Sequence, residues 1–271
     1  MTQSPPAARA ADLIAAADGL LITAGAGMGV DSGLPDFRGP EGFWRAYPAL
    51  KHKGFGFTDI ANPEAFRRNP RLAWGFYGHR LQLYRKTTPH NGFAILKRWA
   101  ESKPQGVFVF TSNVDGHFQK ADFAEDRIVE CHGSIHRLQC AATCSDSIWP
   151  ADDFAPDVDE ENCLLRSPLP TCPACGALAR PNILMFDDGD WQERRYEVQR
   201  ENLRRWLGCV RRPVVIEIGA GRSVPTVRHF SESLGAPLIR INREAADASG
   251  ATVSLPMNAL EALQAIDPHA R

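Results

Sequence analysis

The sequence of 271 residues lacks any apolar run close to the roughly 18 residues that a membrane span requires. Its first residues, Met-Thr-Gln-Ser-Pro-Pro, lack the basic start and apolar core of a secretory signal. Charges of the two signs nearly cancel to a net −1, which gives no global attraction to nucleic acid or to an anionic membrane. No internal repeat is found in it. We therefore expect a cytoplasmic, globular protein and a monomer, with neither nucleic acid nor a membrane as partner.

The seven cysteines are an odd number and do not suit a disulfide framework. Cys140 and Cys144 form one close pair, and Cys172 and Cys175 form a second. Two short-spaced thiolate pairs are typical of a closed tetrahedral zinc site in a reducing compartment. Four sulfur ligands leave no open position on the metal, so we expect one structural Zn2+ per chain and exclude a zinc-dependent hydrolase. Cys163, in the loop between the pairs, is the substitute ligand if one of the four does not bind. A set of buried free cysteines is the alternative to the zinc site.

A glycine-rich segment, Gly25 to Gly39, follows the apolar run Leu20 to Thr23. A buried strand that opens into a turn with paired glycines lets the backbone approach a pyrophosphate closely. The segment departs from the common dinucleotide fingerprint, which has a third glycine followed by a regular helix. Pro35, Phe37 and Arg38 follow instead. The segment therefore predicts a dinucleotide site with a loop that closes over the ligand.

Apolar runs that predict buried strands alternate with helical periodicity along the chain. Strands are expected at 20–23, 107–110, 128–129, 214–218 and 238–241. Helices are expected at 8–18, 89–100 and 225–234. This alternation predicts an α/β fold, a Rossmann-like doubly wound parallel sheet that binds ligands at the carboxyl ends of its strands.

Two insertions interrupt this pattern. Helical periodicity at 63–68 and 72–84 predicts a helical insertion from about 40 to 88. The cysteine pairs predict a zinc-ribbon insertion from about 135 to 186. The two insertions would form a small domain within one catalytic region, 8–271. The larger, dinucleotide-binding part would comprise 8–39, 89–134 and 187–271.

Polar residues follow two of the predicted strands. Asn113 and Asp115 follow the strand at 107–110, and His132 with Gly133 follows the shorter run at 128–129. An Asp side chain accepts from a carboxamide NH2, and Asn donates or accepts. A loop His beside a Gly suits a general base near neutral pH, although many loop histidines are structural or merely solvated.

In order and spacing, these segments resemble the signatures of the sirtuins, which are NAD-dependent protein deacylases. The resemblance extends from about Leu20 to Asn242 and fits the bacterial type. It implies NAD+ as cofactor and acylated proteins or peptides as substrates. It also implies that nicotinamide and O-acyl-ADP-ribose are released. Sirtuins likewise carry a four-cysteine structural zinc ribbon at this point in the chain.

The resemblance implies roles for individual residues. His132 would be the general base that deprotonates a ribose hydroxyl, Asp115 would bind the nicotinamide carboxamide, and Asn113 would position a water or a ribose hydroxyl. Phe37 and Arg38 would cover the nicotinamide ribose. The other implied cofactor contacts are Ala24, Gly25, Ala26, Asp36, Ser112, Gly219, Ala220, Gly221 and Asn242.

Several positions depart from the sirtuin pattern. Sirtuins usually have Ser at Gly29, Gln at Ser112 and Leu-His at His117-Phe118. Their Gly-Thr-Ser turn corresponds to 219–221. Because the base His132 is retained while polar cofactor contacts are trimmed, we expect altered rate, acyl choice or NAD affinity before loss of activity.

Two segments concern the substrate. The stretch 180–186 resembles the strand with which sirtuins pair the backbone of the acyl-lysine peptide. The implied contacts are Ile183, Leu184, Met185 and Phe186, with Asn182 for the usual Asp and Phe186-Asp187-Asp188 for Phe-Gly-Glu. Tyr77 and Arg80 lie three apart on one helix face, where a hydroxyl and a guanidinium would clamp a small carboxylate. A Tyr-x-x-Arg pair marks the subclass of sirtuins that accepts succinyl- and malonyl-lysine.

The sequence thus predicts an NAD-dependent protein lysine deacylase. Protein mono-ADP-ribosyl transfer or NAD hydrolysis is the alternative that Ser112 and the segment 186–188 favour. A non-catalytic NAD-sensing module is a second alternative. The joint presence of His132, Asn113 and Asp115 argues against that module.

Overall fold

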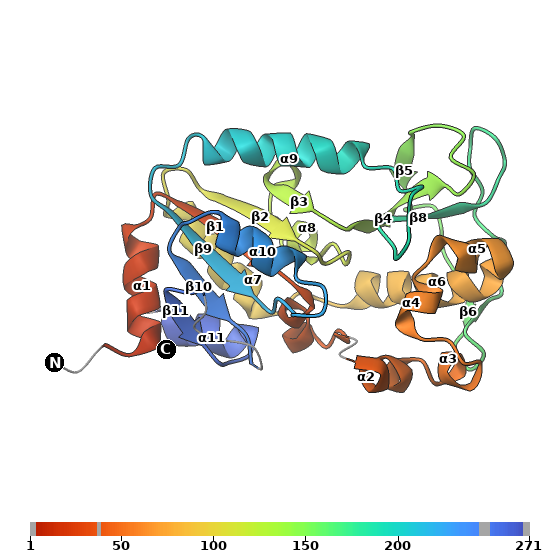
Figure 1. Ribbon diagram of the computed structural model, residues 1–271, viewed down its shortest axis with the longest axis horizontal. Helices are drawn as coiled ribbons and strands as arrows, with labels where there is room; N and C mark the ends of the chain where they lie inside the picture. Colours follow the sequence, from red (N-terminus) through yellow and green to blue (C-terminus); the bar gives the residue numbers. More distant parts are fainter. Residues whose placement is uncertain (1–3, 37–38, 244–249, 268–271) are drawn as a thin grey trace.

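A computed structural model describes residues 4–36, 39–243 and 250–267. Its centre is a parallel sheet of six strands in the order β11-β10-β9-β1-β2-β3 (Figure 1). The strands are β1 (Gly19–Ala24), β2 (Val107–Thr111), β3 (Ile128–Glu130), β9 (Pro213–Ile218), β10 (Leu238–Ile241) and β11 (Val253–Leu255). The chain runs from β1 outward to β3, and the later strands continue outward from the other side of β1. The order therefore reverses between β1 and β9, which is where such sheets bind ligands.

Helices cover both faces of this sheet, which confirms the doubly wound α/β fold. One core contains side chains of α1 (Pro6–Ala16), α7 (Asn91–Glu101) and α11 (Ala259–Ile266). The opposite core contains side chains of α9 (Arg194–Leu207) and α10 (Thr226–Ser233). Leu20 and Ile22 of β1 face the first core and Leu21 faces the second. A strand covered on both faces reads as a continuous apolar run, which is why the sequence revealed it.

The helical insertion folds into five helices that pack around a core separate from the two cores of the sheet. They are α2 (Gly39–Ala46), α3 (Pro48–His52), α4 (Phe57–Ile60), α5 (Pro63–Arg68) and α6 (Pro70–Lys86). The helix α6 starts earlier than predicted, because Asn69 accepts a hydrogen bond from the Leu72 amide at 3.1 Å and Pro70 occupies the first turn. Aromatic side chains such as Phe66, Trp74 and Phe76 fill this third core.

The cysteine-bearing insertion forms an antiparallel sheet of three strands in the order β5-β4-β8. They are β4 (Gly133–Cys140), β5 (Ile148–Pro150) and β8 (Ala179–Ile183), with a separate pair β6 (Val158–Asp159) and β7 (Leu164–Leu165). Its side chains share one core with the helical insertion, and the Trp74 indole donates to the Ala179 carbonyl at 2.9 Å. Figure 1 shows both insertions at the end of the molecule opposite α1. The strand β4 begins three residues after β3 ends, so His132 lies at the junction of the two sheets.

No helix among the described residues is long and apolar enough to cross a membrane.

Candidate functional site

Two glycine turns meet at the carboxyl ends of β1 and β9. The Gly27 amide donates to the Gly219 carbonyl at 3.1 Å, and the Gly25 amide donates to the Ile218 carbonyl at 2.9 Å. A Cβ at Gly27 would lie 2.6 Å from the Gly219 Cα, and Gly219 has φ of +64°. The turns therefore touch backbone to backbone and leave no room for side chains between them. After Gly25 the chain forms two 3-10 turns, 26–28 and 30–32, in place of a regular helix.

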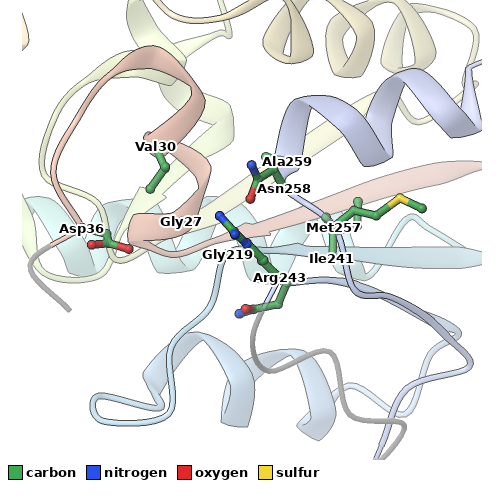
Figure 2. Close-up of a pocket in the computed structure, with 10 residues that line it drawn as sticks. Gly27, Val30, Asp36, Gly219, Ile241, Arg243, Met257, Asn258 and Ala259 are labelled. Carbon is green, nitrogen blue, oxygen red and sulfur yellow. The ribbon is translucent and has the colours of Figure 1, made fainter. Parts of the chain in front are cut away.

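A cavity of about 140 Å3 opens beside this contact (Figure 2). Its walls come from the ends of β1, β9 and β10 and from the start of α11: Gly27, Val30, Asp36, Gly219, Ile241, Asn242, Arg243, Met257, Asn258 and Ala259. Three predicted cofactor residues, Asp36, Gly219 and Asn242, thus face one cavity. The wall at 257–259 was not predicted from the sequence, because the strand β11 that leads to it is short. The predicted contacts Phe37 and Arg38 lie outside the described residues.

Two side chains hydrogen-bond to the residue that follows Gly219 and stabilise the turn. The Ala220 carbonyl accepts from Asn242 Nδ2 at 2.7 Å and from Arg228 Nε at 3.2 Å. Ala220 itself is buried, whereas a side chain at Gly221 would meet open space. The structure therefore brings Gly219, Ala220 and Asn242 together, with Asn242 as a support of the turn.

Asn113 joins the loop after β2 to the glycine turn. Its Nδ2 donates to the Gly25 carbonyl at 3.0 Å, and its own amide donates to Thr111 Oγ1 at 3.0 Å. The Ser112 amide donates to the Ala24 carbonyl at 3.1 Å. Ala24, at the end of β1, is fully buried, and Ala26, within the turn, is exposed. Four predicted cofactor residues (Ala24, Gly25, Ser112 and Asn113) are thus neighbours.

Asp115 is buried at the start of the short helix α8 (His117–Lys120). Its Oδ1 accepts from the His117 amide at 2.9 Å, and its backbone carbonyl contacts His136 Nε2 at 2.9 Å. Burial raises the pKa of Asp115, against the lowering effects of that amide and of the nearby His136 and Arg80. This carboxyl group is therefore fixed in place, as the binding of a carboxamide requires.

His132 is half-buried at the junction of β3 and β4. Burial lowers its pKa, so the imidazole stays neutral and able to take a proton near pH 7. Its carbonyl accepts from the Leu184 amide at 3.0 Å. The next residue, Gly133, has φ of +76°, and a Cβ there would lie 2.0 Å from the Asn182 carbonyl oxygen. The residue His132 is thereby fixed against the predicted substrate strand.

The end of β3 that leads to His132 is tied to α9. Glu130 is 1% exposed and pairs with Arg195, Nη2 to Oε2, at 2.5 Å. The Glu130 amide donates to Gln199 Oε1 at 3.1 Å. Sequence reasoning missed these supports, because Arg195 and Gln199 occur among many other charged residues of a surface helix.

Residues 183–186, the predicted substrate contacts, differ in how far their side chains are exposed. Ile183 and Met185 are buried in the core of the insertions, while Leu184 is 38% exposed. The Phe186 amide donates to the Ala61 carbonyl at 2.9 Å, and its ring meets Phe57 at 5.7 Å between centroids. Of these residues, only Leu184 offers an exposed apolar side chain.

Residues 186–188 correspond to the Phe-Gly-Glu of sirtuins, and the last two of them shape the turn after β8. Asp187 has φ of +53°, a left-handed conformation that favours glycine. Asp188 accepts two hydrogen bonds of 2.8 Å from Arg180, and both side chains are buried. Asp188 therefore fixes the turn that follows the strand β8.

Tyr77 and Arg80 lie side by side on α6, both buried. The Arg80 Nε and Nη2 donate to the hydroxyl of Tyr84, at 3.0 and 2.7 Å. Sequence reasoning predicted the first two residues and missed Tyr84, although it lies one helical turn after Arg80.

The four predicted metal ligands form one cluster. The Sγ atoms of Cys140 and Cys175 are 3.7 Å apart, as are those of Cys144 and Cys172, and all four lie within 4.8 Å of one another. Tetrahedral zinc with bonds of about 2.3 Å places its sulfurs about 3.8 Å apart, so the residues fit zinc. Burial raises the pKa of Cys172, but hydrogen bonds with the amides of residues 174 and 175 and with the thiols of Cys144 and Cys175 together lower that pKa to about 7. Cys163 lies outside the cluster, in the core against α6, so it is not needed as a substitute ligand.

Comparison with known proteins gives a consistent result. Residues 25–205 match the model of the Sir2 family. An NAD-dependent protein deacylase of Aquifex aeolicus is 32% identical over 67% of this chain and 68% of its own length. An NAD-dependent protein deacylase of Thermococcus kodakarensis is 32% identical over 87% of this chain and 84% of its own length. The dog NAD-dependent protein deacylase sirtuin-5, mitochondrial, is 34% identical over 65% and 58%.

A solved structure of a Sir2 homologue in complex with NAD superposes with a TM-score of 0.71 over 97% of this chain and 93% of its own. Its sequence identity is 24%, so it supports the fold alone. The family match covers well over half of the chain and includes the glycine turn, the segment 113–132 and the cysteine cluster. The chain belongs to the Sir2 family.

Proposed function

We propose that this Sir2-family chain is an NAD-dependent protein lysine deacylase. One observation supports the proposal: Asn113, Asp115 and His132 follow the adjacent parallel strands β2 and β3 at their carboxyl ends, and Asn113 donates to the Gly25 carbonyl of the first glycine turn. The contact requires glycine at 27 and 219, because a Cβ at either position would lie 2.4–2.6 Å from the backbone of the other turn. Glycine turns at this edge of a parallel sheet are where such folds hold a pyrophosphate. The family match and the relatives named as deacylases support the same function.

NAD+, when bound, supplies nicotinamide as the leaving group and the ribose that takes up the acyl group. Asp115 would orient the carboxamide, and Asn113 would hold a water or a ribose hydroxyl next to the Gly25 carbonyl. A neutral ring nitrogen of His132 would accept the proton of a ribose hydroxyl. The overall reaction joins acyl-lysine, NAD+ and water to give lysine, nicotinamide and O-acyl-ADP-ribose.

The remaining predicted residues serve binding and stability in this proposal. The residues 183–186 would pair with the main chain of the acyl-lysine peptide, with Leu184 exposed beside His132. Tyr77 and Arg80 would form the end of the acyl pocket and accept acidic acyl groups such as succinyl. The four clustered cysteines would hold a zinc ion that stabilises the small sheet and takes no part in the reaction.

The variant His132→Ala tests the proposal. Removal of a general base lowers the rate by about 10²- to 10⁴-fold, so deacylation should fall by at least 100-fold while the thermal unfolding midpoint is kept. His52→Ala, an exposed histidine on α3, is the matched control and should retain activity. Mass spectrometry of acyl-lysine peptides incubated with NAD+ gives the readout. Full activity of His132→Ala would exclude this base, and a gain of ADP-ribose mass on the peptide would favour ADP-ribosyl transfer.

A panel of acetyl, succinyl and longer acyl peptides tests the choice of acyl group. Arg80→Met keeps much of the side-chain volume and removes the cation, so the preference for succinyl over acetyl should disappear. An unchanged preference would remove the carboxylate clamp from the proposal and leave the deacylase itself in place.

A further inference from the structure

A groove of about 720 Å3 lies between α9 and the small antiparallel sheet. Its walls come from the 3-10 turn Glu125–Arg127, from β4, from the start of β5 and from α9. Figure 1 shows α9 and β5 on the same side of the molecule. The described residues that line this groove differ from those of the cavity beside the glycine turns. Its volume is within the roughly 300–1,000 Å3 of pockets that hold small ligands.

The inner part of the groove offers hydrogen-bond donors. Arg195 and Gln199 lie one helical turn apart on α9, with side-chain exposure of 18% for the arginine and 5% overall exposure for the glutamine. Gln199 Oε1 accepts from the Glu130 amide at 3.1 Å, and its Nε2 has no hydrogen-bond partner among the described residues. A nearly buried donor without a partner costs free energy, so an acceptor from a ligand would stabilise this side chain.

A carboxylate of the chain itself bridges two arginines of the groove. Oε1 of Glu125 accepts from Nη2 of Arg137 at 3.1 Å and from Nη2 of Arg195 at 3.3 Å. Each arginine gives Glu125 a single nitrogen, so neither contact is the bidentate pair of a strong arginine–carboxylate interaction. Nε and Nη1 of both arginines have no partner in the part of the chain that the structure describes. These nitrogens can therefore hold a second carboxylate.

The outer part of the groove limits the charge of a ligand and offers it apolar surface. Three arginines and three acidic residues line the groove, so the groove as a whole does not attract a polyanion. Among the acidic residues, Asp126 and Asp146 are exposed. Val198 is 58% exposed and Ile148 is half-buried, and both line the same groove. A ligand with one negative charge and an apolar body matches these surfaces.

We propose that this groove binds a small organic monocarboxylate with an apolar body. The carboxylate accepts from Arg137, Arg195 and Nε2 of Gln199, and the apolar body packs on Val198 and Ile148. The inference does not rest on the proposed deacylase function, because binding in this groove needs neither NAD+ nor an acyl-lysine peptide.

Calorimetry of the full chain with 3-phenylpropionate tests the site. The neutral 3-phenylpropionamide is the matched ligand, because it has the same apolar body and no charge. The wild-type protein should bind the carboxylate at least about tenfold more tightly than the amide, since hydrogen bonds to a charged group are the stronger ones. Citrate, a polyanion, should bind more weakly than 3-phenylpropionate.

Two variants of the groove locate the ligand. Arg137→Met removes a cation and keeps much of the side-chain volume, and Val198→Glu adds a negative charge at an exposed position. Each should weaken the binding of 3-phenylpropionate about tenfold or more, with the thermal unfolding midpoint kept. Arg204→Met is the matched control, because Arg204 is an exposed arginine of α9 that pairs with Glu201 and does not line the groove. This control should bind as the wild-type protein does.

Arg80→Met separates the groove from the proposed acyl pocket and should also bind as the wild-type protein does. Binding lost in Arg80→Met and kept in Arg137→Met would place the ligand in the acyl pocket and overturn the inference. Equal affinities for 3-phenylpropionate and its amide, or wild-type affinity in both groove variants, would overturn it as well. A protein that binds 3-phenylpropionate in the groove and converts no acyl-lysine peptide would keep this site and lose the deacylase proposal.

Discussion

The backbone contact between the two glycine turns makes Gly219→Ala a sensitive perturbation. A Cβ at Gly219 would lie 2.4 Å from the Gly27 Cα and backbone carbon, and its φ of +64° is left-handed. The left-handed conformation costs an alanine about 1–2 kcal/mol. The overlap with backbone that cannot rotate away costs about 1–3 kcal/mol more, the usual penalty of overpacking. We therefore expect Gly219→Ala to lower the free energy of unfolding by about 2–5 kcal/mol.

Thermal unfolding followed by circular dichroism measures this loss. About 2 °C of midpoint per kcal/mol is expected for a chain of this size, so the midpoint should fall by about 4–10 °C. NAD binding should weaken as well, since Gly27 is displaced with Gly219. Gly221→Ala is the control two residues later, where a Cβ meets nothing within 4 Å and φ is not left-handed. If Gly219→Ala unfolds at the wild-type temperature, or no lower than Gly221→Ala, the two turns do not touch as described.

Three further predictions concern the zinc, the base and a buried histidine. Cys175→Ser should lose the metal measured by atomic absorption and unfold at a lower temperature, while Cys209→Ser, an exposed cysteine outside the cluster, should retain it. Burial lowers the pKa of His132 below its ordinary 6.5, so the imidazole stays neutral as the pH falls to 6.5. The acid limb of the kcat/KM profile should therefore lie below pH 6.5. An acid limb above pH 6.5 would contradict the role of His132 as the general base. His117 is 1% exposed, neither of its ring nitrogens has a hydrogen-bond partner among the described residues, and burial lowers its pKa to about 4. Protonation of His117 therefore favours the unfolded state, and the free energy of unfolding decreases as the pH falls from 6.5 toward 4. His117→Leu should remove this decrease. In urea unfolding at pH 7, the same variant should raise the free energy of unfolding by about 1 kcal/mol.

Most of the central sheet was predictable because burial on both faces leaves a continuous apolar run. The strand expected at 238–241 has those bounds in the structure, and the one expected at 107–110 is extended by one residue. The strand β11 was missed because Val253–Leu255 holds only three residues and alternates apolar with polar, as an edge strand does. Its absence from the prediction also hid the cavity wall that follows it.

Contacts between distant segments could not be read from the sequence. The bond from Asn113 to the Gly25 carbonyl spans 88 positions, and the pair Arg195–Glu130 joins a surface helix to the end of a short strand. Asn113 was predicted as a cofactor contact, and in the structure its side chain donates to the Gly25 carbonyl and so supports the turn. By contrast, the cysteine cluster was predictable because close spacing within each pair limits the geometry that the ligands can adopt.

The positions that depart from the sirtuin pattern are not equivalent in the structure. At Gly221 a side chain would meet open space, so a serine would fit there without displacing a neighbour. At Gly29 a Cβ would lie 3.2 Å from the Leu34 side chain, so glycine there is coupled to the packing of the loop that leads to Asp36. The turn at Ala220 keeps its shape through Asn242 and Arg228. A weakened affinity for NAD would therefore be restored by Gly221→Ser, while Gly29→Ser would first have to displace Leu34.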